Sequence, residues 1–247
     1  MKTYKAVIFD LFDTLVDFDR ARIPVVAVDG VSVRSTAGET YRVLARHATQ
    51  LTFDAYYRLL SAVTKELTAV RERDHLEIPA RRRYEVLFER LSLPRDTAGE
   101  ACIDAMLATH HRHMHDATVC PAERSQVLEA LKSRYPLGLL SNFDSAETGL
   151  RILATHGLRP YFSVIHISEA IGYRKPRREA FLWTAEAMGV APQEALFIGD
   201  TFALDVVGAK GVGMDAAWFD RQTTPPDLDA AKPDYVIARL SDVLEIL

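Results

Sequence analysis

Short apolar runs that end in polar residues recur at the start of the chain and through its second half. The first covers residues 6–9, and similar runs cover residues 137–140 and 195–198. A short continuous apolar run is typical of a strand buried on both faces of a parallel sheet. Further strands are expected over residues 162–165, 216–219 and 235–237, and helices over 146–156, 178–188, 203–209 and after Ser241. This alternation predicts a doubly wound α/β fold with right-handed crossovers.

The middle of the chain has a different pattern. Asp29-Gly30 lies between valine-rich pieces, which is the signal of a tight β-hairpin. Residues 36–39 have the spacing of a capping box, with Thr36 opening a helix and Glu39 three residues on. From there to about residue 115 the periodicity is helical. The pattern therefore predicts a catalytic core formed by residues 1–16 and 117–247 and an inserted, mainly helical cap domain over residues 17–116.

Composition narrows the class of protein. The chain has 247 residues, of which 48% are hydrophobic, a formal net charge of -4 and two cysteines without metal-ligand spacing. A net negative charge does not suggest binding to nucleic acid or to an anionic membrane surface. No apolar stretch reaches the ~20 residues that a membrane-spanning helix needs. The start of the chain has no signal-peptide pattern. We therefore expect a reduced, cytoplasmic protein, either a monomer or a homodimer, whose partner is a small molecule.

Polar side chains follow several of the expected strands. Asp10 follows the first, Ser141-Asn142 another and Asp200 a third, while Lys175 lies in a loop after the strand at residues 162–165. Because ligands of open α/β sheets bind outside the carboxyl ends of strands, we expect these groups around one crevice. Taken singly, each has a plain structural explanation as a turn former, a helix cap or a solvated loop residue. Their occurrence together favours a functional site.

The chemistry of this set points to phosphoryl transfer. Asp10 and Asp200 form a hard oxygen site suited to Mg²⁺. Ser141 and Lys175 could hold phosphoryl oxygens and neutralise their charge, and Asp205 could orient the lysine or a metal-bound water. An aspartate is ordinarily ionised at neutral pH, so Asp10 could attack phosphorus directly and form an aspartyl phosphate.

The chain resembles members of the haloacid dehalogenase superfamily, in the branch with a helical cap inserted after the first strand of a Rossmann-like core. Four motifs carry the resemblance over the whole chain: residues 8–15 around Asp10 and Thr14, Leu140-Ser141-Asn142, Lys175-Pro176, and Gly199-Asp200-Thr201 with Asp205. The resemblance implies that Asp10 is the nucleophile and that Mg²⁺ is bound by Asp10, Asp200 and the backbone carbonyl of Phe12. It also implies that Thr14 fixes the turn after Asp10.

One position departs from the pattern of phosphatases in this family. They usually carry a second aspartate two residues after the nucleophile, as the general acid for the leaving alcohol, and here that position is Phe12. Asp13 is the nearest substitute, although consecutive side chains of extended backbone point apart. Loss of general-acid help costs about 10²–10⁴-fold. Acyl or enol phosphates, which leave more easily, would suffer less than alkyl phosphates.

Three interpretations stay open on the sequence. The first is a Mg²⁺-dependent phosphatase of a small phosphorylated metabolite, favoured by Gly199-Asp200-Thr201 with Asp205. The second is a 2-haloacid dehalogenase that forms an aspartyl ester without metal, favoured by Phe12, since halide needs no proton. The third is a non-catalytic member that binds a phosphorylated metabolite or a protein partner, which the retained Asp10, Lys175 and Asp200 disfavour.

The cap offers candidates for substrate recognition. Arg34 and Thr36 follow the expected hairpin and open a helix, where an anion could bind; the plain alternative is a surface charge and a helix cap. Four histidines lie between residues 110 and 115. Their spacing places them on different helix faces, so we expect polar, partly exposed residues rather than a metal site.

Overall fold

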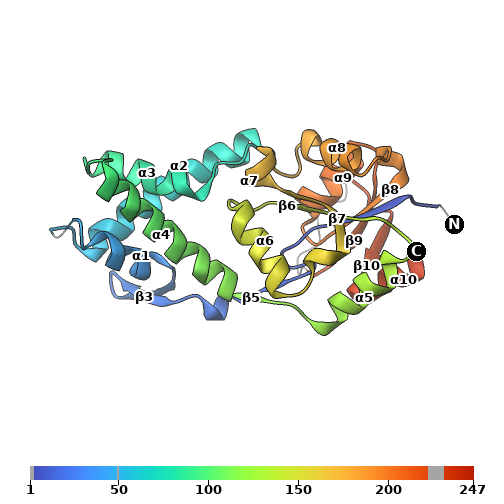
Figure 1. Cartoon of the computed structure of the whole chain (residues 1–247), viewed down its shortest axis with the longest axis horizontal. Helices are drawn as coiled ribbons and strands as arrows, with labels where there is room; N and C mark the ends of the chain where they lie inside the picture. Colours follow the sequence, from blue (N-terminus) through green and yellow to red (C-terminus); the bar gives the residue numbers. More distant parts are fainter. Residues whose placement is uncertain (1–2, 49, 222–230) are drawn as a thin grey trace. The chain divides into compact units, whose positions relative to one another are not determined.

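The computed structural model describes residues 3–48, 50–221 and 231–247. The chain forms two compact units. One, the core, comprises Met1–Phe18 and Val119–Leu247, and the other, the cap, comprises Asp19–Thr118. The cap segment, which follows the first core segment in the sequence, is coloured from blue to green in Figure 1. No helix of the described ranges combines the length and apolarity that crossing a membrane would need.

The core is built on a six-stranded sheet with the order β10-β9-β8-β1-β6-β7, in which every paired neighbour is parallel. From β1 the chain builds outward through β6 and β7, and then returns to the other side of β1 for β8, β9 and β10. A ligand site is expected where the strand order reverses, at the carboxyl end of β1. The expected doubly wound α/β fold is therefore confirmed. The strands are β1 Ala6–Phe9, β6 Leu137–Ser141, β7 Phe162–Ile167, β8 Ala195–Gly199, β9 Asp215–Phe219 and β10 Tyr235–Ile237.

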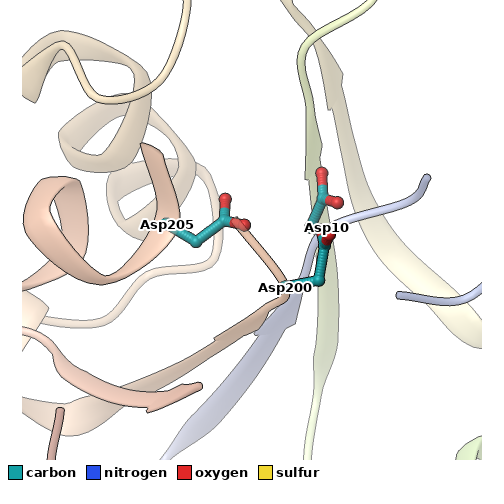
Figure 2. Close-up of side chains that lie close together, drawn as sticks. All are labelled: Asp10, Asp200 and Asp205. Carbon is teal, nitrogen blue, oxygen red and sulfur yellow. The ribbon is translucent and has the colours of Figure 1, made fainter. Parts of the chain in front are cut away.

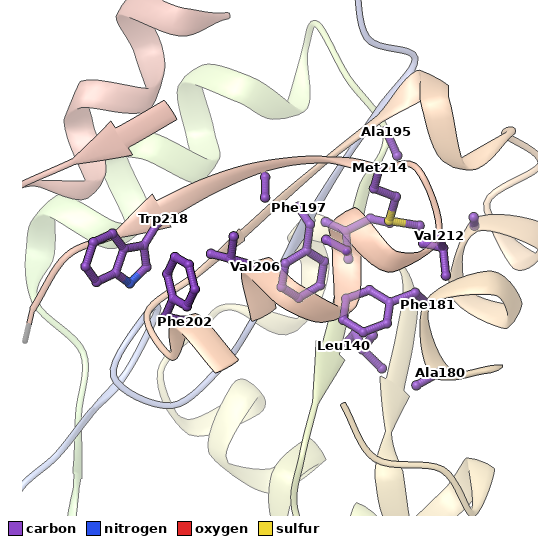
Figure 3. Packing of buried hydrophobic residues seen from close by; sticks show 14 residues of the cluster. Leu140, Ala180, Phe181, Ala195, Phe197, Phe202, Val206, Val212, Met214 and Trp218 are labelled. Atoms are coloured by element: carbon purple, nitrogen blue, oxygen red, sulfur yellow. The ribbon is translucent and has the colours of Figure 1, made fainter. Parts of the chain in front are cut away.

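Helices cover both faces of this sheet, with α8 and α9 on one side and α5 and α10 on the other (Figure 1). Beneath α8 and α9, an apolar cluster buries rings from the helices against the strands (Figure 3). Phe181 meets Phe197 edge-on at 5.1 Å between ring centroids, and Phe202 meets Trp218 at 5.4 Å. The core helices are α5 Ala122–Lys132, α6 Ala146–Thr155, α7 Ser168–Ile171, α8 Arg178–Ala187, α9 Val207–Gly211 and α10 Val243–Ile246.

Among its described residues, the cap contains four α-helices and the expected hairpin. Strands β3 (Val25–Val28) and β4 (Val31–Arg34) pair antiparallel, and Asp29 and Gly30 adopt positive φ angles of 50° and 80° at the turn, as a two-residue hairpin requires. The helices pack around an apolar cluster that includes Tyr56, Tyr84 and Phe88. They are α1 Ala37–Leu44, α2 Phe53–Asp74, α3 Ala80–Arg90 and α4 Thr97–Asp116.

Four local features differ from the sequence prediction. Thr36 precedes α1, but its side chain makes no capping hydrogen bond, because its hydroxyl pairs instead with Nδ1 of His110 at 2.8 Å. The helix expected over residues 203–209 begins as a π-helix, Phe202–Val206, before α9. Ser241 lies inside a short 3₁₀ turn, Leu240–Asp242, rather than capping the last helix. The two-residue strands β2 (Asp17–Phe18) and β5 (Thr118–Val119), which pair with each other, were not predicted.

Candidate active site

Three carboxylates converge at the carboxyl ends of the two central strands. Asp10 follows β1, and its backbone N–H donates to the carbonyl of Ile198 at 2.9 Å, which continues the ladder between β1 and β8. Asp200 follows β8, and Asp205 approaches from the turn beyond it (Figure 2). Carboxylate oxygens of the three residues lie within 4.8 Å of one another. The strand-end clustering expected from the sequence is thus present within the core.

Lys175 is the cation that holds this cluster together. Its ammonium lies 2.5 Å from Oδ1 of Asp10 and 2.7 Å from Oδ1 of Asp205. The lysine is 2% exposed, Asp205 1% and Asp10 7%. Ionic groups this deeply buried are tolerated when they are paired, and removing one partner of such a pair typically costs about 3–5 kcal/mol. The lysine therefore pairs with Asp10 and Asp205 at the same time.

Asp205 is placed by the irregular turn after β8. A π-helical turn, which is common at functional sites, directs its side chain back to the strand end, where Oδ2 accepts from the backbone N–H of Thr201 at 2.9 Å. Gly199 makes room for this approach, because a Cβ at that position would lie 2.4 Å from the Asp205 carboxyl carbon. Asp205 thus connects the turn to the Lys175 ammonium.

Asn142 fixes the backbone of the lysine loop. Its Nδ2 donates to the carbonyl of Lys175 at 3.0 Å, and its Oδ1 accepts from the Lys175 N–H at 2.8 Å. Both ends of the amide are therefore used to hold one residue. The geometry gives Asn142 the role of positioning Lys175.

Burial and charge shift the pKa values of Asp10, Asp200 and Lys175. Desolvation raises the pKa of Asp10 to about 7, with Lys175 opposing the shift and the charges of Asp205 and Asp200 adding to it. Desolvation, followed by the charges of Asp205 and Asp13, raises the pKa of Asp200 to about 6. Burial alone would lower the pKa of Lys175, but Asp10 and Asp205 raise it above its usual value. The expectation that Asp10 is fully ionised at neutral pH is therefore too simple for the metal-free protein.

The donor set fits a hard divalent cation. Asp10 and Asp200 both have raised pKa values, in part because their negative charges lie close to other carboxylates. A cation between the two carboxylates would offset this repulsion and favour their ionised forms. Oxygen donors are what Mg²⁺ prefers. Asp205 has both carboxylate oxygens in short contacts, with Lys175 at 2.7 Å and with the Thr201 N–H at 2.9 Å. Asp10 has only Oδ1 in a short contact, with Lys175, and its Oδ2 lies 3.4 Å from the Thr14 hydroxyl. Asp10 and Asp200 are therefore the side chains better suited to bind the ion.

Two further residues predicted to belong to the site are deeply buried. Thr14 is fully buried, and its hydroxyl donates to Oδ2 of Asp10 over a long 3.4 Å. Ser141 is also fully buried, and its hydroxyl finds no hydrogen-bond partner among the described residues. A buried hydroxyl without a partner is uncommon and calls for an explanation such as an incoming ligand.

Phe12 is held in an aromatic group at the edge of the site. Its ring centroid lies 4.9 Å from that of Phe143 and 6.3 Å from that of Phe18. The next residue, Asp13, has a left-handed φ of 58° and accepts a hydrogen bond at Oδ1 from the backbone N–H of Phe18 at 3.1 Å. A phenyl ring cannot donate a proton, and the Asp13 carboxylate serves the turn.

These groups surround a pocket of about 190 Å³ within the core. Sequence reasoning missed several residues that shape it or its backbone. Arg174 lines the pocket, the indole of Trp218 donates to the Asp200 carbonyl at 2.9 Å, and Arg221 donates to the Asp13 carbonyl at 2.8 Å. Only Arg174 had a signal, its adjacency to Lys175. The pocket is lined by Asp10, Phe12, Asp13, Asn142, Arg174, Lys175, Asp200, Thr201, Leu204 and Asp205.

The predicted cap residues Arg34 and Thr36 make contacts inside the cap. Nη1 of Arg34 donates to the carbonyls of Ala21 and Ile23 at 2.7 and 3.1 Å, so this arginine secures the segment that precedes the hairpin. Thr36 pairs with His110, which is 8% exposed. His115, from the same histidine group, pairs with its neighbour Asp116 at 2.8 Å.

The family of this chain follows from comparison with known proteins. The haloacid dehalogenase-like hydrolase family matches residues 4–213. The chain belongs to this family. The assignment made from the four motifs is therefore confirmed, and so is the prediction that the protein is a hydrolase.

Individual relatives bear names of two kinds. The chain is 29% identical over its whole length to a glyceraldehyde 3-phosphate phosphatase of Pyrococcus furiosus, covering 94% of that protein. It is similar in structure to a 2-haloacid dehalogenase of Pseudomonas syringae, with a TM-score of 0.76, 25% identity, and coverage of 99% of this chain and 98% of that one. It shares its fold with the magnesium-bound putative hydrolase YfnB of Bacillus subtilis, with a TM-score of 0.63, 20% identity, and coverage of 100% and 99%.

Proposed function

We propose that this hydrolase is a Mg²⁺-dependent phosphatase of a small phosphorylated metabolite and that Asp10 forms an aspartyl phosphate. The observation that carries the proposal is the buried Asp10 beside both Asp200 and Lys175. The 2.5 Å contact between Lys175 and Asp10 would keep the nucleophile oriented, and Asp10 and Asp200 would hold the cation between them. The phosphatase name of a relative matched over the full chain and the magnesium in a structure of the same fold support this choice.

The residues of the pocket suit a two-step transfer. An oxygen of Asp10 attacks phosphorus as the bond to the leaving oxygen breaks, and water then attacks the same phosphorus, which releases phosphate and restores Asp10. Bound Mg²⁺ would draw charge from the phosphoryl oxygens and keep the two carboxylates ionised. Lys175 balances the charge around Asp10, and Asn142 keeps the lysine in place.

The leaving group must obtain its proton from elsewhere than position 12. Phe12 cannot supply it, so we propose that substrates with good leaving groups are turned over fastest. Acyl phosphates and anhydrides need little protonation, whereas an alkyl phosphate without acid help loses about 10²–10⁴-fold.

The decisive assay is a substrate panel with Mg²⁺ or with excess EDTA. It contains acetyl phosphate, glyceraldehyde 3-phosphate, glycerol 3-phosphate and 2-chloropropionate. We expect phosphate release only with Mg²⁺, with acetyl phosphate turned over fastest, and no turnover by Asp10→Asn. The matched control is Asp54→Asn, an exposed aspartate in the first turn of α2, which should retain full activity. Metal-independent phosphate release, or an active Asp10→Asn, would rule the proposal out.

A second candidate is a 2-haloacid dehalogenase. Phe12 favours it, since halide leaves without a proton, and so does the likeness to the Pseudomonas syringae enzyme. In that reaction Asp10 displaces halide from carbon, and water attacks the carbonyl carbon of the resulting ester. Chloride release from 2-chloropropionate in EDTA would select this function over the first.

A further inference from the structure

A cavity lies within the cap and shares no lining residue with the pocket of the core. Its volume is about 500 Å³, inside the range of small-molecule pockets. One wall is the length of α2, and the others are the turn before α1 and the start of α3. It is lined by Ser35, Thr36, Tyr57, Leu60, Ser61, Thr64, Lys65, Thr68, Ala69, Glu72, Arg83 and Tyr84.

The lining combines hydroxyl groups with an excess of positive charge. Seven of the twelve side chains carry a hydroxyl, two are basic and one is acidic. Lys65 and Arg83 supply the positive charges and Glu72 the negative one. Hydroxyl groups can donate and accept, so such a wall suits a ligand with several hydroxyls of its own. The basic pair suits one anionic group on the same ligand.

Helix geometry separates Arg83 from the two arginines before it. Successive residues of a helix point about 100° apart. Arg81 forms ion pairs with Glu100, Asp104 and Glu85, the last at 3.2 Å, and Arg82 pairs with Glu89 at 2.8 Å. Neither lines the cavity, whereas Arg83 does. Of the three consecutive arginines 81–83, Arg83 is therefore the one whose side chain lines the cavity.

The walls are held by buried contacts. Thr36 is fixed by its hydrogen bond to His110, which comes from α4. Tyr84 is 1% exposed and belongs to the apolar centre of the cap. A cavity whose walls are already fixed loses little conformational entropy when a ligand binds.

We propose that this cap cavity is a binding site for a small, hydroxylated aliphatic anion, with Arg83 and Lys65 holding the anionic group and the hydroxyl-rich wall of α2 holding the rest. The site goes beyond the proposed function and does not depend on it, because the cavity contains neither Asp10 nor any other residue of the core pocket. An anionic group of this kind is either a carboxylate or a phosphate, and the same two cations would bind both.

Equilibrium binding to the full-length protein in excess EDTA tests the proposal. Without metal and at pH 8, where Asp10 and Asp200 are ionised, the core pocket presents four carboxylates against two cations, so it should repel an anion. The calorimetric probes are gluconate and glycerol 3-phosphate, with sorbitol as a hydroxylated neutral molecule and propionate as an anion without hydroxyls. We expect at least one of the first two to bind at least tenfold more tightly than sorbitol and propionate, and the tighter one identifies the anionic group.

Two variants connect this binding to the cavity. Arg83→Gln and Lys65→Gln should each weaken the bound probe about tenfold, as loss of one charge-assisted contact implies. Arg82→Gln, the neighbouring arginine outside the cavity, should bind like the unaltered protein, and near-equal thermal midpoints show that all three variants fold. Binding of neither anion, equally tight binding of sorbitol, or unchanged affinity in Arg83→Gln would overturn the proposal. The binding measurement does not depend on catalysis, so a finding that Asp10 has no phosphatase activity would leave the cavity proposal unchanged.

Discussion

The affinity of the core pocket for Mg²⁺ should depend steeply on pH between 6 and 8. The two expected ligands, Asp10 and Asp200, have pKa values raised to about 7 and about 6 in the metal-free protein. Metal binding requires ionised carboxylates, so protons must leave before the ion enters. Lowering the pH through this window therefore makes binding weaker.

The size of the effect follows from these two values. Because these values are about 7 and about 6, most molecules at pH 6 keep at least one of the two protons, whereas at pH 8 most have lost both. The apparent dissociation constant for Mg²⁺ should then be on the order of tenfold larger at pH 6 than at pH 8. Metal binding should release about one proton at pH 6 and almost none at pH 8.

The same two carboxyl groups should make the free energy of unfolding depend on pH in the opposite direction: in EDTA the stability falls as the pH rises, whereas Mg²⁺ affinity increases. In EDTA, the folded protein keeps protons that the unfolded chain has released between about pH 4 and pH 7, because the pKa values are raised on folding. This contribution to stability is therefore lost as the pH rises through that window. Saturating Mg²⁺ should reverse the trend, since it favours the ionised folded state.

Isothermal titration calorimetry in two buffers of different ionisation enthalpy measures both affinity and proton release. Asp200→Asn should weaken Mg²⁺ binding and reduce proton release at pH 6, whereas the exposed-site control Asp54→Asn should change neither. If Mg²⁺ bound equally well at pH 6 and pH 8, or without proton release at pH 6, the pair of buried carboxylates could not be its ligands.

Three substitutions in the core test how the site is held together. Asn142→Ala removes both hydrogen bonds to the Lys175 backbone and should lower the free energy of unfolding by about 1–3 kcal/mol, with a fall in kcat rather than a rise in KM. Gly199→Ala places a methyl group against the Asp205 carboxylate and should reduce kcat about 10²-fold through misplacement of the cluster. Phe12→Asp should raise kcat/KM for glycerol 3-phosphate by up to about 10²-fold, the lower end of a general-acid contribution, and should change acetyl phosphate hydrolysis little.

Each of these has a clear contrary result. Gly211→Ala is the matched control for Gly199→Ala, because a Cβ at Gly211 meets nothing within 4 Å; equal activity of the two variants would show that the Asp205 approach is unimportant. An Asn142→Ala variant with unchanged kcat would remove the positioning role from that amide. No gain in Phe12→Asp would mean that a missing proton donor does not limit alkyl phosphates.

The strands and the site could be predicted because both depend on short-range patterns. A buried parallel strand needs an uninterrupted apolar run, and the residue after it must lie at the sheet edge, so Asp10 and Asp200 were found from position alone. Lys175 could be assigned because its motif occurs in order with the others. These features can be recognised in a single sequence, because each depends on a short stretch of consecutive residues.

Features that depend on distant partners could not be predicted. Thr36 has the local spacing of a helix cap, but His110, which lies 74 residues away, takes its hydroxyl. The raised pKa of Asp10 comes from burial and from charges brought together by folding. The contact of the Trp218 indole with the Asp200 backbone also links separate strands. Local sequence carries no trace of these pairings.

Direct detection of the covalent intermediate tests the central claim, that Asp10 is the nucleophile of a phosphatase. The protein is mixed in excess with acetyl phosphate carrying a radiolabelled phosphoryl group, in the presence of Mg²⁺, and is quenched in acid within milliseconds. We predict label on the proteolytic peptide that contains Asp10, lost on treatment with hydroxylamine as an acyl phosphate should be, and none in Asp10→Asn. Phosphate release without labelled protein at any quench time, or label on a different residue, would contradict the account.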